Sequence, residues 1–524
     1  MRLFRRLDFN LILIPLLLIF AIAPLTQPGF FVAHSGFLPL LNLFDLEKAL
    51  PGLGWAPRIG EEYNLFTSEG PLPYALAETF RLLGMSGAQA VKATYALGFL
   101  LSGLAIYALV RRLFGPYGGL IAALVYTYLP YHLAVVYLRG AFAESVVFVL
   151  FPLLLWALDV GIKEGGRFAL GVLALLFAAL ALTQAGLAVL YALFLWAYMF
   201  VLGPSREAKV RTASALGVGV GLGFLLLLPL ILQGGYILGP RPDFSRHFLY
   251  PFQLFSPTWK YGSIEMGWKG GFPFQLGAVA TGLALLSLFA PSGGEKEVRG
   301  KTLFFLAGAG VMVLLTLGPA RLFWETTRLS WLLAYPWQLL ALIGLCTSVA
   351  AGGLLALEPR LAHFPWRAAV VALIVLGSYD YLSPRFTDFE VKKPAQGILG
   401  DKVVLLDYKL EGPLRHGATI RLTLYWQALK EMEKDYTVFV HVVDEEGTVW
   451  GQWDSQPISG ERPTSGWERG EVIEDAYKIS IDVEGPREGY RIKVGMYLVE
   501  TEERLPTEGD TFILIELKGD GTDG

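Results

Sequence analysis

Long apolar segments recur along residues 1–383 of this chain, and they limit its fold more than any other feature. A helix needs about 20 apolar residues to cross the roughly 30 Å hydrocarbon core of a bilayer. The chain is 54% hydrophobic and only 17% charged, whereas soluble domains average about 45–50% and 25%. We therefore predict a membrane all-α bundle with about 11 transmembrane helices. The predicted spans cover residues 10–31, 93–110, 118–136, 144–160, 168–183, 186–203, 212–233, 273–290, 302–318, 331–357 and 367–383.

Lys and Arg residues cluster in alternate loops between the predicted spans. Because cytoplasmic loops are enriched in these residues, the N-terminus with Arg2, Arg5 and Arg6 is predicted to lie inside. The intervening loops are then external, and the longest of them cover residues 32–92 and 234–272. The pattern predicts a multi-pass protein of the plasma (cytoplasmic) membrane.

The pattern of the sequence changes period after residue 383. Residues 384–400 are predicted to be a linker. Apolar and polar residues then alternate in about seven short runs between residues 401 and 518, which is typical of antiparallel strands. We predict an extracytoplasmic all-β sandwich there, followed by a flexible tail at 519–524. Cys346 is the only cysteine, so no intrachain disulfide stabilises this sandwich.

The distribution of charge argues against two classes of function. The net charge is −3 and no long block carries one sign, so a nucleic-acid partner is not expected. Ionisable residues are nearly absent from the middle of the predicted spans, whereas ion-coupled transporters place charged groups there. Polar residues gather instead in the long external loops, and loops of this length are usually functional. Any chemistry is therefore expected at the external membrane surface.

Short motifs follow one another in a fixed order along most of the chain. They include Ala33-His34-Ser35-Gly36, Arg139-Gly140-Ala141-Phe142-Ala143-Glu144, Tyr335-Pro336-Trp337-Gln338, Phe439-Val440-His441, Gln452-Trp453-Asp454 and Val494-Gly495-Met496-Tyr497. In this order they resemble a family of bacterial multi-spanning membrane proteins in the GT-C-type glycosyltransferase superfamily. The resemblance implies transfer of a sugar from a polyprenyl-phosphate donor to a cell-envelope acceptor on the external face of the membrane. It also implies an acidic residue in the first external loop, acting as general base or metal contact.

Two positions depart from the pattern of that family. The resemblance implies an Asp directly after His34, where this chain has Ser35. A serine hydroxyl cannot serve as a carboxylate base near neutral pH. The resemblance also implies an Arg after Trp337, where this chain has Gln338, which carries no positive charge for a phosphate. The chain has thus either lost its catalytic base at this position or uses another residue as the base.

The candidate catalytic residues are acids of the first external loop. Transfer from a lipid phosphate needs a base for the acceptor hydroxyl, and positive charge or a divalent cation for the departing phosphate. Glu61 and Glu62 are the candidate bases, with Asp45 behind them, although two adjacent glutamates also suit a solvated loop. No cofactor is certain. No metal ligands are assigned, because His34 and His132 are isolated from each other and from acidic partners.

Candidate binding residues lie in the external loops and in the tail. Arg58 and Arg139 are predicted to bind the phosphate, although Arg139 and Glu144 equally suit an internal ion pair. Trp337 suits a sugar platform or an anchor at the membrane interface, and Trp426 suits the core of the sandwich. The further candidates are His34, Glu144 and Trp268 for the substrate, and Trp467 for a glycan at the surface of the tail domain.

Two other functions stay open at this point. One is a non-catalytic membrane protein that binds or presents envelope glycan through the sandwich, in keeping with Ser35 at the position of the expected Asp. The other is a transporter or flippase of a lipid-linked substrate, which the lack of charge within the spans disfavours.

Overall fold

The structure is a computed structural model of the chain. It describes residues 8–49, 58–59, 63–64, 70–203, 205–232, 244–259, 272–290, 296–387, 397–430, 432–467, 470–507 and 510–515. The chain divides into two compact units. We call Met1–Phe31 with Phe66–Phe386 the membrane unit, and Val32–Leu65 with Thr387–Gly524 the sandwich unit. Residues 32–65, the first part of the long external loop predicted from the sequence, therefore group with the C-terminal residues.

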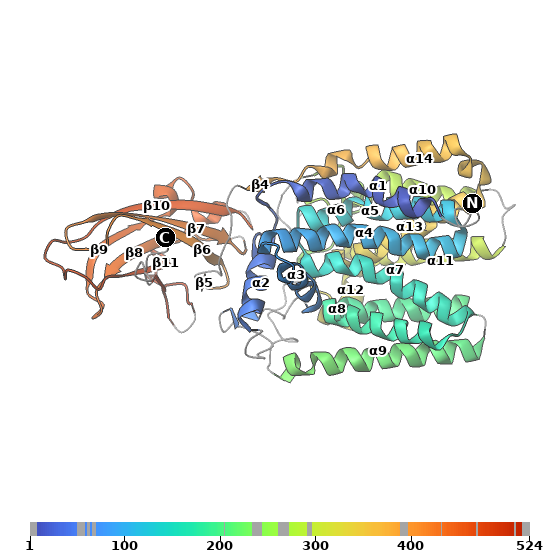
Figure 1. Cartoon of the computed structure of the whole chain (residues 1–524), viewed down its shortest axis with the longest axis horizontal. Helices are drawn as coiled ribbons and strands as arrows, with labels where there is room; N and C mark the ends of the chain where they lie inside the picture. Colours follow the sequence, from blue (N-terminus) through green and yellow to red (C-terminus); the bar gives the residue numbers. More distant parts are fainter. Residues whose placement is uncertain are drawn as a thin grey trace. The chain divides into compact units, whose positions relative to one another are not determined.

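The membrane unit consists of helices, and most of the long ones run alongside one another (Figure 1). Short 3-10 segments link several of them, and Phe30–Phe31 forms the short strand β1. The helices are α1 (Asn10–Ile22), α3 (Leu72–Leu82), α4 (Gly87–Phe114), α5 (Pro116–Thr127), α6 (Pro130–Tyr137), α7 (Phe142–Lys163), α8 (Arg167–Leu202), α9 (Arg206–Leu232), α10 (Ala278–Phe289), α11 (Lys296–Thr316), α12 (Arg321–Thr327), α13 (Leu340–Leu357) and α14 (Phe364–Leu376).

Within the described residues, six helices are long and apolar enough to cross a membrane. The count rises to seven if α5 and α6, which meet at a bend of 42°, form one broken span. Three shorter apolar helices cover Asn10–Thr26, Ala278–Phe289 and Phe364–Leu376. The prediction of a multi-pass membrane protein is confirmed, but the count of about 11 spans is not, because several predicted segments form helices shorter than a bilayer requires.

Helix α8 is interrupted where the sequence predicts a turn between two spans. Gln184 has non-helical torsion angles, with φ −156° and ψ 93°. An unbroken helix of its 36 residues would be about 54 Å long, far more than the hydrocarbon core. The break frees backbone carbonyls that need partners in a membrane, and the amide of Gly70 donates a hydrogen bond of 2.8 Å to the carbonyl of Thr183.

Helix α13 is packed at the centre of the membrane unit and is almost entirely buried. It approaches α5 through glycine: a Cβ at Gly352 would lie 2.7 Å from the carbonyl oxygen of Gly118, and a Cβ at Gly118 would lie 2.6 Å from that of Gly352. Small residues allow two helix backbones to come this close in a bilayer, where van der Waals packing drives association.

We expect Gly352→Ala to destabilise the membrane unit by about 1–3 kcal/mol, the usual cost of overpacking. The matched control is Gly282→Ala in α10, because a Cβ at Gly282 meets nothing within 4 Å and Ala favours a helix more than Gly does. Thermal unfolding in detergent should show a lower midpoint for the first variant only. Equal midpoints for the two variants would contradict the close approach of α5 and α13.

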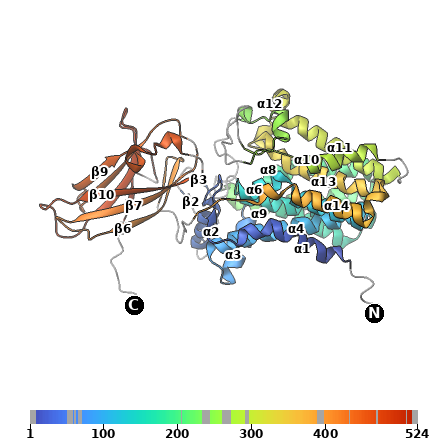
Figure 2. The ribbon, with the colours of Figure 1, turned by 90° about the horizontal axis from the view of Figure 1, so that it is seen from above.

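The sandwich unit contains two four-stranded sheets, with strand orders β10-β7-β6-β5 and β12-β11-β8-β9. Figure 2 shows β10, β7 and β6 side by side, and every pair in both sheets is antiparallel. The predicted strand-rich C-terminal region is therefore confirmed. The strands are β5 (Gly397–Leu399), β6 (Val403–Glu411), β7 (Thr419–Ala428), β8 (Thr437–Val443), β9 (Val449–Ser455), β10 (Val472–Ser480), β11 (Arg491–Tyr497) and β12 (Ile513–Ile515). The unit also holds α2 (Leu38–Ala49), β2 (Arg58–Ile59) and β3 (Tyr63–Asn64), and β4 (Phe386–Thr387) lies at the boundary.

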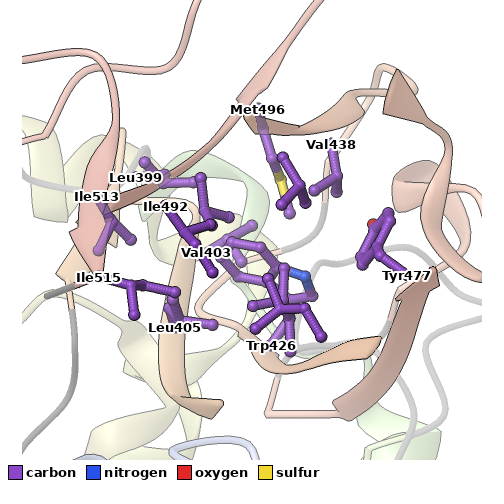
Figure 3. Packing of buried hydrophobic residues seen from close by; sticks show 14 of the residues in the cluster. Leu399, Val403, Leu405, Trp426, Val438, Tyr477, Ile492, Met496, Ile513 and Ile515 are labelled. Carbon is purple, nitrogen blue, oxygen red and sulfur yellow. The ribbon is translucent and has the colours of Figure 1, made fainter. Parts of the chain in front are cut away.

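One apolar core joins the two sheets. Figure 3 shows Val403 and Trp426 from the first sheet and Ile492 and Met496 from the second among the side chains of this core. Trp426 is fully buried, so its predicted place in the core is confirmed. Trp467 is buried as well, and its indole N–H donates 2.9 Å to the carbonyl of Arg462. The prediction that Trp467 lies at the surface is wrong, and its ring is not accessible to a glycan.

Candidate functional site

Glu61 and Glu62 lie outside the described residues, and so does Trp268. The backbones of Asp45 and Arg58 belong to α2 and β2, but their side chains fall outside the described part. The roles predicted for these five residues stay predictions.

A buried ion pair links the turn after α6 to the first turn of α7. Nη1 of Arg139 lies 2.5 Å from Oε2 of Glu144, and only 3% of the Glu144 side chain is exposed. Gly140 adopts φ +62°, a conformation that glycine takes readily, and this allows the chain to reverse between the two charged residues. The internal ion pair that the sequence left open is therefore confirmed, and contact with substrate stays a prediction.

A tyrosine completes the hydrogen bonding of the glutamate. The hydroxyl of Tyr131 in α6 donates 2.6 Å to Oε1 of Glu144, while Nη1 of Arg139 donates 3.3 Å to the same hydroxyl. Both carboxylate oxygens of Glu144 thus have a partner, as buried charge requires. Since the guanidinium and the carboxylate neutralise each other, the cluster holds no net charge for a phosphate in this arrangement.

Aromatic rings enclose the ion pair. The guanidinium of Arg139 lies 4.3 Å from the centre of the Trp337 ring, a distance suited to a cation–π interaction. The Trp337 ring stacks on Tyr335 with centroids 4.7 Å apart, and it packs against Phe274 at 5.3 Å. Trp337 is fully buried. A sugar platform and an interface anchor both need an exposed ring, and Trp337 presents none in this arrangement. Its predicted contact with substrate stays a prediction.

Gln338 has a structural role at the position where the resemblance implies Arg. Its Oε1 accepts a hydrogen bond of 3.1 Å from the amide of Tyr335. It thereby caps the short 3-10 helix Pro336–Leu339 that leads into α13. A residue that closes this turn holds Trp337 beside Arg139.

The start of the loop predicted to be external is buried within the sandwich unit. His34 is almost fully buried, and the carbonyl of Ser35 accepts a hydrogen bond of 3.4 Å from Nε2 of Gln427. Oε1 of the same glutamine accepts one of 2.9 Å from the amide of Phe37. The sequence does not identify Gln427, because it and the loop are 390 residues apart.

Three motifs of the tail meet on the second sheet. Nε2 of His441 lies 3.1 Å from Oδ1 of Asp454, and the hydroxyl of Tyr497 donates 3.3 Å to Oδ2. In the strand register, Phe439 of β8 stands opposite both Asp454 of β9 and Gly495 of β11. His441, Asp454 and Tyr497 are at least partly exposed, whereas Phe439 is buried beneath them. The sheet therefore presents a polar cluster that the sequence motifs alone did not assign to one place.

Across the part of the chain that the structure describes, no group of three or more His, Cys, Asp and Glu residues could hold a metal ion. The acids of residues 60–62 lie outside that part. A divalent cation at the departing phosphate therefore stays a prediction.

The long apolar helices and the C-terminal sheets define the class: a multi-pass membrane protein with a strand-rich C-terminal domain. Residues 68–232 match the family model for dolichyl-phosphate-mannose-protein mannosyltransferase. The matched segment includes α3 to α9 and the ion pair of Arg139 and Glu144. Over these residues, which are less than half of the chain, the sequence is thus similar to a family of mannosyltransferases. None of the curated protein sequences matches the chain.

Three solved structures show a distant similarity to this chain. The arabinofuranosyltransferase AftD from Mycobacteria is 16% identical over 72% of this chain and 27% of its own, with a TM-score of 0.48. This chain thus spans about a quarter of that protein. ArnT from Cupriavidus metallidurans, bound to undecaprenyl phosphate, is 14% identical over 72% of this chain and 76% of its own, with a TM-score of 0.43. The Archaeoglobus fulgidus oligosaccharyltransferase is 14% identical over 71% of this chain and 54% of its own, with a TM-score of 0.36.

Proposed function

We propose that this protein is a membrane glycosyltransferase that takes a sugar from a polyprenyl-phosphate donor on the external face of the membrane. The match of residues 68–232 to a family described by dolichyl-phosphate-mannose carries this proposal, because dolichyl phosphate is itself a polyprenyl phosphate. The acceptor is a molecule of the cell envelope.

The mechanism needs a base for the acceptor and a positive group for the departing phosphate, and different residues are assigned to each role. Glu61 or Glu62, with Asp45 as a further candidate, removes the proton from the acceptor hydroxyl. Arg58, or a divalent cation held by the loop acids, stabilises the departing phosphate. Arg139 is neutralised by Glu144 in the described arrangement, so it reaches a phosphate only if the ion pair opens.

Turnover of a labelled polyprenyl-phosphate hexose by the purified protein in liposomes tests the proposal. Release of the sugar to an acceptor or to water supports a glycosyltransferase. Lipid that crosses the bilayer without losing its sugar would instead indicate a flippase. Binding of donor or envelope glycan without either event would indicate a non-catalytic protein, the second candidate function, which Ser35 at the expected position of an Asp favours.

The external location of the chemistry can be measured separately by cysteine labelling. The single native cysteine, Cys346, is buried, so a membrane-impermeant maleimide should give little background. Glu446→Cys, in an exposed turn of the sandwich unit, should react in intact cells. Glu207→Cys, at the exposed start of α9, should react only after the membrane is permeabilised. The reverse pattern of labelling would place the sandwich unit in the cytoplasm and end the external assignment.

A further inference from the structure

Gln427 connects the first external loop to the sandwich. It lies near the end of β7 and is fully buried. Alternate residues of a strand face opposite sides of the sheet, so Gln427 points away from the side on which Trp426 enters the core. Its side-chain oxygen accepts from the amide of Phe37, and its side-chain nitrogen donates to the carbonyl of Ser35. The side-chain amide of Gln427 thus forms hydrogen bonds with two backbone groups of the loop.

Two glycines allow the loop and the sandwich to approach each other closely, Gly36 against the side chain of Gln427 and Gly470 against the backbone of Ala33. Gly36 has φ +50°, and a Cβ there would lie 2.3 Å from Nε2 of Gln427. Gly470 has φ +81°, and a Cβ there would lie 2.0 Å from the carbonyl oxygen of Ala33. Any larger residue at either position would collide with the opposite partner and would also be strained by its positive φ. The fit between the two segments therefore depends on the absence of side chains.

The held segment leads directly to the candidate acids. Hydrogen bonds from the amide of Gly36 to Ala33 and from the amide of Leu38 to Ser35 form the turn that begins α2. Helix α2 carries Asp45, and the chain then continues to Glu61 and Glu62. Because Phe37 is buried as well, the start of this path is fixed on the sandwich.

We propose that Gln427 is a positioning residue that clamps residues 35–37 to the sandwich, so that the C-terminal domain orients the loop bearing the catalytic base. This proposal rests on the proposed glycosyltransferase function and gives the sandwich a part in it. The sandwich acts through the loop and does not need to contact the donor itself.

The clamp can be tested by Gln427→Leu, which keeps the volume of the side chain and removes both hydrogen bonds. We expect amide hydrogen exchange at residues 35–49 to accelerate at least tenfold. We also expect kcat for sugar transfer to fall at least tenfold while KM for the lipid donor stays unchanged, because the clamp acts on the base and not on donor binding. Gln427→Glu keeps the acceptor for the Phe37 amide and loses the donor to Ser35. Its hydrogen exchange and kcat should therefore lie between those of the wild type and those of Gln427→Leu.

Thr423→Val provides the matched control. Thr423 lies on the same face of β7, two alternations away, and is largely buried. It should leave both hydrogen exchange and transfer unchanged. Gly470→Ala would push Ala33 away from the sandwich. It should therefore accelerate hydrogen exchange and lower kcat as Gln427→Leu does.

The two measurements separate the possible failures. Unchanged exchange at residues 35–49 in Gln427→Leu would overturn the clamp. Faster exchange with unchanged kcat would show a clamp without influence on catalysis and would overturn the positioning role. If the wild-type protein transfers no sugar under any condition, the proposed function fails, while hydrogen exchange still reports whether the clamp exists.

Discussion

Glu61→Gln combined with Glu62→Gln is expected to reduce sugar transfer by about 100- to 10,000-fold, the usual contribution of a general base. Glutamine keeps the size of the side chain but cannot accept the proton of the acceptor hydroxyl at neutral pH. The loss should fall on kcat, because a base acts in the transition state and adds little to donor binding. Initial rates with a labelled polyprenyl-phosphate sugar, measured over a range of donor concentrations, provide the check.

A second pair of adjacent glutamates supplies the control for this experiment. Glu445 and Glu446 lie in an exposed turn between β8 and β9, and their replacement by Gln removes the same charge without touching the first loop. That control should retain wild-type rates. Full activity in the Glu61 and Glu62 double variant would remove both residues as the base, and Asp45→Asn would then be the next variant to measure.

Glu144→Ala is expected to destabilise the membrane unit by about 3–5 kcal/mol, the cost of leaving a buried charge without its partner. The guanidinium of Arg139 would stay enclosed between Tyr131 and Trp337 after losing the carboxylate of Glu144. Replacing both partners, Arg139→Met with Glu144→Leu, should recover most of the stability because no unpaired charge remains. Thermal unfolding in detergent without substrate measures both effects.

An exposed ion pair provides the comparison for the buried one. Nε of Arg321 lies 2.8 Å from Oε1 of Glu325, with 59% and 45% of the two side chains exposed. Glu325→Ala should cost less than about 1 kcal/mol, as exposed pairs usually do. If Glu144→Ala is equally mild and nevertheless abolishes transfer, the ion pair serves the substrate and not the fold.

Local features of the molecule could be predicted from the sequence because their causes are local. Apolar length predicts the long helices, and the interruption between two apolar runs predicts the break at Gln184. Alternation predicts the strand-rich tail and places Trp426 in its core. Each of these follows from the period of a single segment, so no knowledge of distant residues is needed.

Tertiary partners explain what the sequence did not predict. Trp467 follows a turn that resembles a surface loop, yet the hydroxyl of Thr464 accepts from the amide of Tyr436 and donates to the carbonyl of Lys434. This pair of hydrogen bonds draws the turn inward and buries the indole. Gln338 likewise stands where the sequence resemblance implies a positively charged Arg. In the structure its side-chain oxygen accepts a hydrogen bond from the amide of Tyr335 and caps a short helix. Neither contact leaves a periodic signal.

The sandwich unit combines Val32–Leu65 with Thr387–Gly524, two segments that the ribosome synthesises at different times. Phe37 and Gln427 are 390 residues apart, and translation at about 5–20 residues per second separates their synthesis by roughly 20–80 s. During this interval residues 35–37 lack the strand β7 whose Gln427 later contacts them. A factor that shields this segment until β7 has been synthesised would therefore raise the yield of correctly folded protein.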